Sequence, residues 1–495
     1  MAEGFNPLTG MDYPDPDVIR VGDTYYMIST TMHFFPGAVI LRSHDLIRWE
    51  ICSYLYETLE HTPGETLEGE QTAYGHGMWA ASLRYRAGRF YVIFIAHEWP
   101  KTFLFTAENI EGPWTKQYID GIYHDPSLLF DDDGRIYIVY GNREICLTEL
   151  KEDISGPKPG GVDRIILRDA PGGPLGYEGS HLYKINGKYV LFLIHSRLRE
   201  WFRTEACFIT DDLEGVWAGG DVLYSDLDGL HSGAAQGGIV DTPDGRWFAV
   251  LFQDRGAVGR IPVLVPVTWN QYGFPVFGEV TKEVSNACTR PDWTPQPLFA
   301  GDDFTSPALK NVWQFNHEPR AGCWETGNGA YVIRTDKVSR TLEFARNTLT
   351  QRTVLPGCTA EVTLDASSVR PGDVAGLCLL IGSYGLIGVT REKEGYALVM
   401  KARKPREQEE HEYARIPWNK KEARLRASVR FAGHEGIVQF EYLEGEAWKP
   451  LGPVHTMAFA LDHFTGCRFG LFLYATEETG GSASFSGFTY RQDTD

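Results

Sequence analysis

Hydrophobic and polar residues alternate in five similar segments in the N-terminal part of the chain. In each segment a short alternating stretch is followed by a turn that contains glycine, and then by a run of aromatic and β-branched residues. This order predicts a β-hairpin. The five segments cover residues 17–29, 82–94, 127–141, 181–194 and 238–252.

The spacing of these hairpins predicts a β-propeller. Their turn glycines are 66, 46, 53 and 58 residues apart, at Gly22, Gly88, Gly134, Gly187 and Gly245. Each interval leaves room for two further strands, so the repeating unit has four strands and about fifty residues. Units of this kind that recur around an axis are propeller blades, and five copies predict five blades. An all-β chain with ordinary hairpins is the alternative, but the repeated order of turn and aromatic residues favours the propeller.

The C-terminal part of the chain follows a different pattern. The segment 289–304 contains three prolines and predicts an extended linker. Alternating stretches separated by turn residues then continue to the end of the chain and predict a β-sandwich of jelly-roll type. We therefore expect an all-β protein with a five-bladed propeller at 1–288, a linker at 289–300 and a sandwich at 301–495.

Composition agrees with this organisation and narrows the function. A chain of 495 residues exceeds what one core usually supports, and 53 glycines favour frequent turns. The net charge of −19 disfavours binding to nucleic acid or to an anionic membrane, so we expect a neutral substrate. The N-terminus "MAEGFNPLTG" has no signal-peptide pattern, which predicts a cytoplasmic protein. The eight cysteines form no CxxC pair and predict buried thiols and not a metal cluster.

Three acidic residues stand directly before the hairpins of the first, third and fourth units. They are Asp15 in "YPDPDV", Asp125 in "YHDPSL" and Glu178 in "GYEGSHL". The second and fifth units have "MWAAS" and "AAQGG" at this place, so the acids belong to particular blades and not to the turn itself. If the units are related by rotation about one axis, the three carboxyl groups face a common central pocket.

Clustered carboxyl groups suggest acid–base chemistry. They raise one another's pKa, which suits a general acid beside an ionised base, and glycoside hydrolysis needs two carboxyl groups that flank one bond. Each candidate also has a structural interpretation. Asp15 precedes a proline, which is ordinary turn chemistry. Arg260 could pair with a blade carboxylate, and Trp79 could pack between blades. The matched acids in three units favour catalysis.

Four segments carry a resemblance to a known family. They read "NPLTGMDYPDPDVIRVGD", "HDPSLLFDDDGRIYIVYG", "YEGSHLYKINGKYVLFL" and "QDRGAVGRIPVLVPVTW". Together they resemble glycoside hydrolase family 43, and in particular its β-xylosidases and α-L-arabinofuranosidases with a C-terminal β-sandwich. The resemblance continues through 344–353 and 372–385. The fold that it implies is a five-bladed propeller, in agreement with the repeat.

The resemblance implies a role for each acid. Asp15 corresponds to the general base that activates water, and Glu178 to the general acid that protonates the leaving oxygen. Asp125 corresponds to the residue that orients the acid and keeps it protonated. Since the family inverts the anomeric centre, the base and the acid should be ~6.5–9.5 Å apart to admit a water molecule.

The resemblance also implies substrate contacts. Arg260 and Trp79 correspond to residues that bind the terminal sugar. The segment "MHFFPG" contributes Met32, Phe34 and Phe35, of which we expect one phenylalanine to line the pocket and the other to pack. Met32 stands where the family often has Phe, so the sugar preference does not transfer directly.

Other departures from the family concern a metal ion. Ala235-Gln236 replaces a common His-Gln, whose histidine often holds a central calcium ion or an ordered water. His231 could compensate, and we leave a structural calcium open while expecting that no cofactor is required. Asp17 replaces a common Ser. We expect structural roles for the acids in "FDDDGR" and structural or indirect roles for His33, His124, His195 and His231.

These observations predict an exo-acting, inverting glycosidase that removes terminal β-D-xylosyl units from xylo-oligosaccharides. An enzyme that mainly removes α-L-arabinofuranosyl units is one alternative, and a non-catalytic sugar-binding propeller is another. We expect a small oligosaccharide as the partner, with no nucleic acid and no membrane, and leave a homo-oligomer open.

Overall fold

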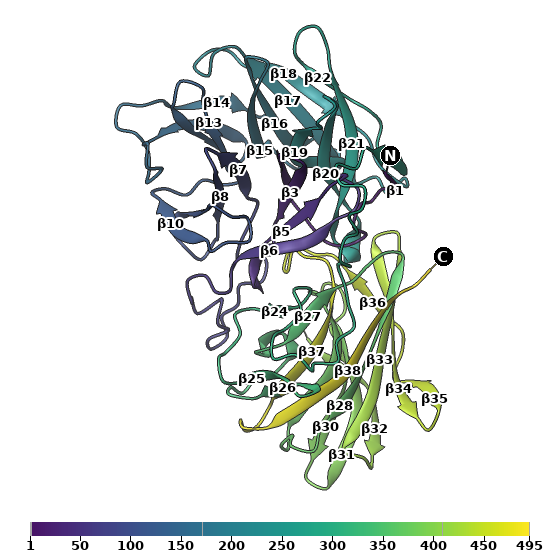
Figure 1. The fold of residues 1–495 in the computed structure, drawn as a ribbon. Helices are drawn as coiled ribbons and strands as arrows, with labels where there is room; N and C mark the ends of the chain where they lie inside the picture. Colours follow the sequence, from purple (N-terminus) through teal and green to yellow (C-terminus); the bar gives the residue numbers. More distant parts are fainter. Residues whose placement is uncertain (1, 171, 408, 495) are drawn as a thin grey trace.

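The computed structural model describes residues 2–170, 172–407 and 409–494 and contains two all-β domains (Figure 1). A propeller built from the N-terminal half lies against a sandwich built from the C-terminal half. In the described residues the only helical elements are two short 3-10 turns, η1 (Gly256–Val258) and η2 (Leu342–Phe344). No helix in these ranges has the length and apolar character needed to cross a membrane. The predicted fold class is confirmed.

Five four-stranded sheets form the five predicted blades. Blade 1 contains β2 (Asp17–Val21), β3 (Thr24–Ser29), β5 (Gly37–Ser43) and β6 (Glu50–Tyr56). Blade 2 contains β7 (Ser82–Arg86), β8 (Arg89–Ile95), β9 (Thr102–Ala107) and β10 (Thr115–Ile119). Blade 3 contains β11 (Ser127–Phe130), β12 (Ile136–Tyr140), β13 (Glu144–Leu150) and β14 (Asp163–Arg168). Blade 4 contains β15 (Glu178–Ile185), β16 (Lys188–Ser196), β17 (Arg203–Thr210) and β18 (Ala218–Leu223). Blade 5 contains β19 (Ala234–Asp241), β20 (Trp247–Asp254), β21 (Arg260–Trp269) and β22 (Pro275–Phe277).

The five predicted hairpins are the first two strands of the blades, and all five turns are confirmed. Their glycines have φ between +63° and +88°, a region that residues with a side chain rarely adopt. The repeated glycine is therefore required by the backbone of the turn.

The first strands of the blades contact one another in a ring around the propeller axis. Buried polar side chains at the start of these strands join each blade to the next. The amide of Leu83 donates to Asp17 Oδ2 (2.7 Å), and the amide of Leu182 donates to Ser127 Oγ (2.8 Å). Between them, the amide of Leu128 donates to Ser82 Oγ (3.2 Å). These bonds set the relative height of the blades at the axis.

Arg84 occupies the centre of this ring and uses all five of its donors. Its Nη1 donates to Asp17 Oδ2 and to the carbonyl of Leu83, both at 2.7 Å. Its Nε donates to the carbonyl of Leu128 (2.8 Å), and its Nη2 donates to Ser127 Oγ (2.9 Å) and to the carbonyl of Leu182 (3.4 Å). One guanidinium thus binds residues of blades 1, 2, 3 and 4.

The first and last strands of the propeller domain pair with each other and help to close the ring of blades. β1 (Ala2–Phe5) pairs with β23 (Glu283–Asn286) after the last blade. Nε of Arg20 on blade 1 donates to the carbonyl of Asp241 on blade 5 (3.0 Å), and the two side chains form an ion pair. Closure therefore combines main-chain pairing and a charge pair.

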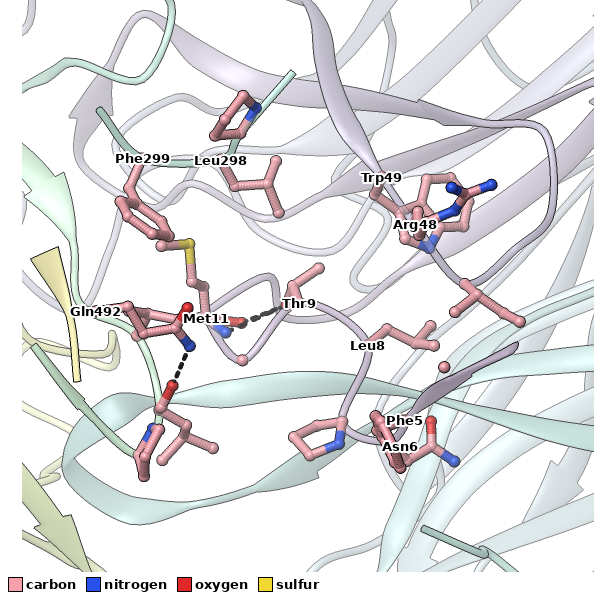
Figure 2. Close-up of a pocket in the computed structure, with 18 of the residues that line it drawn as sticks. Phe5, Asn6, Leu8, Thr9, Met11, Arg48, Trp49, Leu298, Phe299 and Gln492 are labelled. Carbon is pink, nitrogen blue, oxygen red and sulfur yellow. Dashed lines mark hydrogen bonds between the residues drawn. The ribbon is translucent and has the colours of Figure 1, made fainter. Parts of the chain in front are cut away.

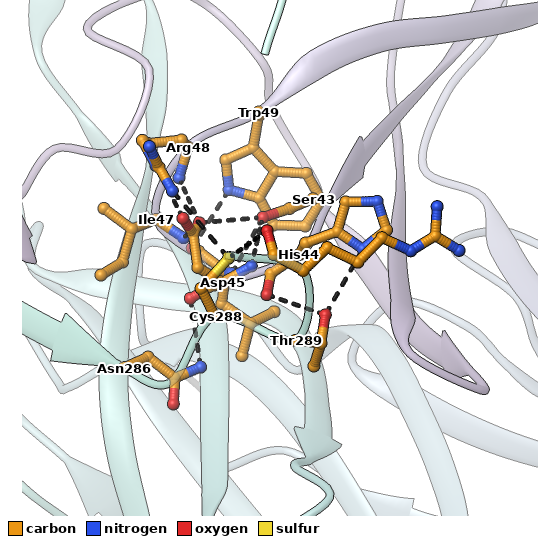
Figure 3. Close-up of polar contacts among 11 residues, drawn as sticks. Ser43, His44, Asp45, Ile47, Arg48, Trp49, Asn286, Cys288 and Thr289 are labelled. Atoms are coloured by element: carbon orange, nitrogen blue, oxygen red, sulfur yellow. Dashed lines mark hydrogen bonds and ion pairs between the residues drawn. The ribbon is translucent and has the colours of Figure 1, made fainter. Parts of the chain in front are cut away.

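The segment after β23 is bonded to blade 1 (Figure 3). Asp45, which is fully buried, accepts from the amides of Ile47 (2.9 Å) and Arg48 (2.8 Å) and so shapes the turn between β5 and β6. Nδ2 of Asn286 donates to the Asp45 carbonyl (3.1 Å), and the amide of Thr289 donates to the His44 carbonyl (2.8 Å). The proline-rich segment that we expected to be a linker therefore starts from a fixed point on the propeller.

The sandwich has two eight-stranded sheets. One consists, in spatial order, of β32 (His411–Trp418), β31 (Gly395–Ala402), β30 (Gly385–Glu392), β29 (Asp373–Leu380), β37 (Arg468–Ala475), β27 (Leu349–Arg352), β24 (Gln314–Asn316) and β4 (Phe34–Phe35). The other consists of β25 (Trp324–Gly327), β26 (Ala330–Arg334), β38 (Ser482–Gln492), β28 (Gly357–Asp365), β33 (Glu422–Ala432), β34 (Glu435–Glu444) and β35 (Ala447–Pro450), with β36 (His455–Ala458) also paired to β34.

The two domains share a sheet, because the edge strand of the first sandwich sheet, β4, lies between β3 and β5 of the propeller in the sequence. Phe35 pairs with Phe315 and Phe34 with Asn316. Farther along the interface, Arg352 Nε donates to the carbonyl of Asp12 (2.7 Å). One continuous apolar core includes residues of both domains. The domains are therefore held as a unit and not only tethered.

A cavity of about 740 Å³ lies where the N-terminal segment meets the linker and the sandwich (Figure 2). Its lining includes Leu8 and Trp49 from the propeller, Phe299 from the linker and Gln492 from the last strand. None of the site residues predicted from the sequence lines this cavity. The candidate site must be located from the carboxylates themselves.

Three buried histidines pack together across the domain interface. The ring of His33, on the propeller, is 4.8 Å from that of His317 and 6.2 Å from that of His463, both on the sandwich. Tyr74 packs against His463 at 3.9 Å. Burial lowers the pKa of both His33 and His317, so both are neutral in the folded protein at neutral pH.

Replacement of Arg84 tests the importance of the central hub, by which we mean Arg84 and the residues of four blades that it binds. Arg84→Met leaves the carboxylate of Asp17 buried without its cation, and we expect a loss of about 3–5 kcal/mol in the free energy of unfolding. Denaturant unfolding measures this loss. Arg135→Met, which removes an exposed ion pair with Asp133, is the control and should change stability by less than about 1 kcal/mol. Equal stability of the two variants would contradict the stabilising role that we assign to Arg84.

The histidine cluster should make the protein less stable in acid. A histidine with a lowered pKa stays neutral when folded but gains a proton when unfolded, so its contribution is present above pH 6.5 and lost as the pH falls below it. Two such groups predict a loss of about 2–3 kcal/mol between pH 7.5 and pH 5.5. Denaturant unfolding of His33→Phe across this pH range should show only about half of the loss that the wild type shows. The exposed control His411→Phe should keep the wild-type pH dependence; an unchanged slope in His33→Phe would argue against the cluster.

Candidate active site

Asp15 and Asp125 lie two residues before the first strand of their blades, and Glu178 is the first residue of β15. Asp15 and Asp125 are structurally equivalent: each precedes a proline and adopts a left-handed backbone, with φ of 52° and 45°. In blade 4 this position is taken by Gly179, with φ of 64°, and Glu178 lies one residue earlier. The prediction of equivalent positions therefore holds for the two aspartates but not for Glu178.

Asp15 is buried and both of its oxygens are engaged. Oδ1 accepts from Arg260 Nη1 (2.7 Å), and Oδ2 accepts from Thr30 Oγ1 (2.7 Å). Burial raises the pKa of Asp15, Arg260 opposes this rise, and the nearby charge of Asp125 adds to it. These contacts fix the orientation of the carboxylate.

Asp125 and Glu178 come together around a histidine. Asp125 Oδ2 accepts from the amide of Gly179 (3.1 Å), which ties blade 3 to the residue next to Glu178. Nε2 of His124 lies 3.7 Å from Asp125 Oδ2 and 3.5 Å from Glu178 Oε2. Nδ2 of Asn142 also donates to Glu178 Oε2.

The charges in this group depend on one another. Burial raises the pKa of Asp125, the His124 imidazolium opposes that rise, and Glu178 adds to it. In return, Asp125 is the main cause that raises the pKa of His124 to about 9, so the ring is charged at neutral pH. Glu178 and, to a smaller extent, Asp15 also raise the pKa of His124, which places all three acids within electrostatic reach of one ring.

Arg260 and Trp79 border the same group of acids. The guanidinium of Arg260 is stacked on Phe464 at 4.2 Å from the ring centre. Trp79 is half-buried, and its ring is 4.0 Å from that of His97, 5.7 Å from that of His124 and 5.9 Å from that of Phe464. Phe464 belongs to the sandwich, so both domains contribute to the wall of the site.

Met32, Phe34 and Phe35 are all buried on the segment between β3 and β5. The main chain of Met32 pairs with that of Met78 in both directions at 3.0 Å, which joins blades 1 and 2 near the site. Phe34 lies beneath Arg468 at the domain interface, and Phe35 belongs to the apolar core between blades 1 and 2. Their predicted contact with substrate stays a prediction; the contacts described place them in packing roles.

The residues at the propeller axis do not fit a calcium site. Calcium requires six to eight oxygen ligands, including carboxylates. The carboxylate at the axis, Asp17, is bound by Arg84 at 2.7 Å and has His181 at 3.7 Å. His231, which we considered as a substitute ligand, is exposed on the loop before β19. Asp17, which stands where the family often has Ser, is the first residue of β2 and forms the ion pair with Arg84.

His124, Asp125 and Glu178 form the one group in the described ranges whose nitrogen and oxygen atoms, all within 4.8 Å of one another, are close enough to hold a metal ion. The protonated ring already lies between the two carboxylates, and an imidazolium has no free lone pair for a metal. We therefore do not assign them as metal ligands.

Several contacts at the site were not predicted from the sequence. Thr30, Asn142 and Phe464 carry no motif that distinguishes them from other loop residues, and the contact of Phe464 requires the docking of the sandwich. His124 was assigned an indirect role, although its place beside Asp125 in "YHDP" offered a signal. A histidine that is adjacent in sequence to a candidate acid is therefore itself a candidate for a contact in the site.

Comparisons with known proteins agree with this arrangement. A β-xylosidase of Formosa agariphila is 26% identical over 99% of this chain and 90% of its own length. Xylosidase/arabinosidase 43B of Humicola insolens is 27% identical over 98% of this chain and 97% of its own length. A solved structure described as a bifunctional GH43-CE protein of Bacteroides eggerthii is 39% identical, with a TM-score of 0.92 over 99% of this chain. This chain spans 64% of that longer protein.

Family descriptions match both domains. "Glycosyl hydrolases family 43" matches residues 5–275, which include Asp15, Asp125, Glu178 and Arg260. "Beta xylosidase C-terminal Concanavalin A-like domain" matches residues 301–491, which include Phe464. Because the first match covers the propeller with its carboxylates and the second covers the sandwich, the chain belongs to glycosyl hydrolase family 43 and is a glycosidase of the xylosidase and arabinofuranosidase type.

Proposed function

We propose that this glycosidase is exo-acting and inverting, and that it releases terminal β-D-xylosyl units from xylo-oligosaccharides. The observation that carries the proposal is the meeting of acids from blades 1, 3 and 4 beside Arg260, under a wall that the sandwich completes with Phe464. A site to which a second domain adds a wall suits the end of a sugar chain better than its middle.

Asp15 and Glu178, at opposite ends of the cluster of three acids, suit different steps of hydrolysis. Asp15 accepts two hydrogen bonds and pairs with a cation, which favours an ionised base that takes a proton from water. As the water oxygen bonds to the anomeric carbon, the bond from that carbon to the leaving oxygen breaks, and Glu178 gives its proton to the leaving oxygen. Asp125 binds the amide beside Glu178 and so orients the acid.

Two sugars fit the substrate assignment, because Met32 stands where the family often has Phe and the family's sugar preference does not transfer directly. A relative that matches 99% of this chain is named a β-xylosidase, which supports xylose. Another is named a xylosidase/arabinosidase, which supports α-L-arabinofuranosyl release as a second activity. Rates on the nitrophenyl β-D-xyloside and α-L-arabinofuranoside separate the two.

We further propose that the reaction needs no metal or organic cofactor, since the chemistry assigned to the two carboxyl groups is complete without one. The net charge of −19 suits a neutral oligosaccharide and disfavours nucleic acid or an anionic membrane as partner. Short oligosaccharides imported into the cell fit an enzyme located in the cytoplasm.

Removal of either catalytic carboxylate should abolish turnover. We expect Asp15→Ala and Glu178→Ala each to lower kcat on xylobiose by about 10³-fold or more, with circular dichroism spectra like the wild type. NMR of the first product formed by the wild type should show the α-anomer of xylose. The control Asp132→Asn changes an exposed carboxylate on a hairpin and should keep full activity. A wild-type rate in either alanine variant would refute the assigned roles.

Neutralising Asp125 should change the pH dependence of the reaction. The charge of Asp125 raises the pKa of Asp15, so Asp125→Asn should let the base ionise at lower pH. The acid limb of kcat/KM should therefore move to lower pH, while the maximum rate falls about 10–100-fold because Glu178 loses its orienting partner. A pH–rate profile of wild type and variant measures both effects, and an acid limb that moves to higher pH would contradict the electrostatic coupling.

A further inference from the structure

His124 is the cation nearest to the acid end of the site. Its Nε2 is 3.5 Å from Glu178 Oε2 and 3.7 Å from Asp125 Oδ2, and the side chain is 24% exposed. In blade 1 the residue before the equivalent aspartate is Pro14, which has no side-chain donor. The imidazole is thus specific to blade 3, the neighbour of the blade that carries Glu178.

The contacts of Glu178 distinguish its two oxygens. Asn142 donates to Oε2, and Nε2 of His124 faces the same atom. In the described part of the chain, no side chain or amide donates to Oε1. A protonated carboxyl group donates from one oxygen and accepts at the other, so the Asn142 donor and the imidazolium 3.5 Å away favour a proton on Oε1 over one on Oε2.

We propose that His124 is a positioning residue that acts with Asn142 to hold Oε2 of Glu178, so that the transferable proton is carried on Oε1 and faces the leaving sugar oxygen. This inference rests on the function proposed above. When the glycosidic bond breaks, the proton moves from Oε1 to the leaving oxygen, and Glu178 is left as a carboxylate whose Oε2 already faces a cation.

The same ring balances charge at the centre of the site. Arg260 pairs with Asp15, and His124 lies beside Asp125, so each aspartate has its own cation. Burial raises the pKa of Asp125, and the adjacent imidazolium opposes that rise and so favours the ionised form.

Substrates with different leaving groups test this role. A 2,4-dinitrophenyl pentoside releases a stable anion and needs no proton, whereas xylobiose or the matching arabino-disaccharide releases a sugar alkoxide that does. We expect His124→Phe to lower kcat on the disaccharide by about 50-fold and kcat on the dinitrophenyl substrate by less than about 3-fold. His124→Gln, which keeps an N–H donor without the charge, should recover part of the loss on the disaccharide.

The controls separate this proposal from the proposed function. Wild-type enzyme that hydrolyses neither pentoside would refute the function itself, whereas a wild type that is active on both leaves His124 to be judged alone. The exposed His411→Phe on β32 should match the wild type on both substrates. Equal losses on the two substrates, or no loss, in both His124 variants would overturn the positioning role, and His124→Gln decides the question if His124→Phe does not fold.

Discussion

The propeller depends on a buried ion pair between Arg84 and Asp17 at its axis. A fully buried carboxylate is costly to place in a protein unless it is paired and hydrogen-bonded, and Asp17 is fully buried. The guanidinium meets that requirement and also binds three main-chain carbonyls and Ser127. Four blades therefore share one rigid centre. Asp15 and Asp125 lie two residues before β2 and β11, and Glu178 is the first residue of β15, so the strands that meet at this centre also carry the three acids.

The active site is completed by contacts that lie far apart in the sequence. β4 of the propeller chain extends a sandwich sheet, and this pairing holds the segment that contains Met32 next to the second domain. The sandwich in return places Phe464 against Arg260, which holds Asp15. The interface and the candidate site are also adjacent along the chain, because Met32 precedes His33 and His463 precedes Phe464. A loss of packing at the interface would therefore act on residues that are adjacent in sequence to residues of the site.

Electrostatics divides the site into two halves. At one end, Asp15 has an arginine and a threonine as partners, which favours the charged form of a base. At the other end, Asp125 and Glu178 share the His124 imidazole, and Glu178 also accepts from Asn142, so a proton donor and a negative neighbour lie close together. Similar carboxyl groups can therefore serve opposite roles because their neighbours differ, and the fold brings these neighbours from blades 1, 3 and 5.

The sequence by itself determined the repeating unit, the turn glycines and the three acids, because these depend on local backbone geometry and on patterns within about fifty residues. It also indicated Arg260 and Trp79 through their motifs. It did not indicate Arg84 as the hub or the role of Asp17, since the five partners of Arg84 come from four blades and meet only after the ring closes. Phe464 and Asn142 could not be identified for the same reason: their function is a contact, and only tertiary packing decides which residues lie within hydrogen-bond or van der Waals distance of a carboxylate or a guanidinium.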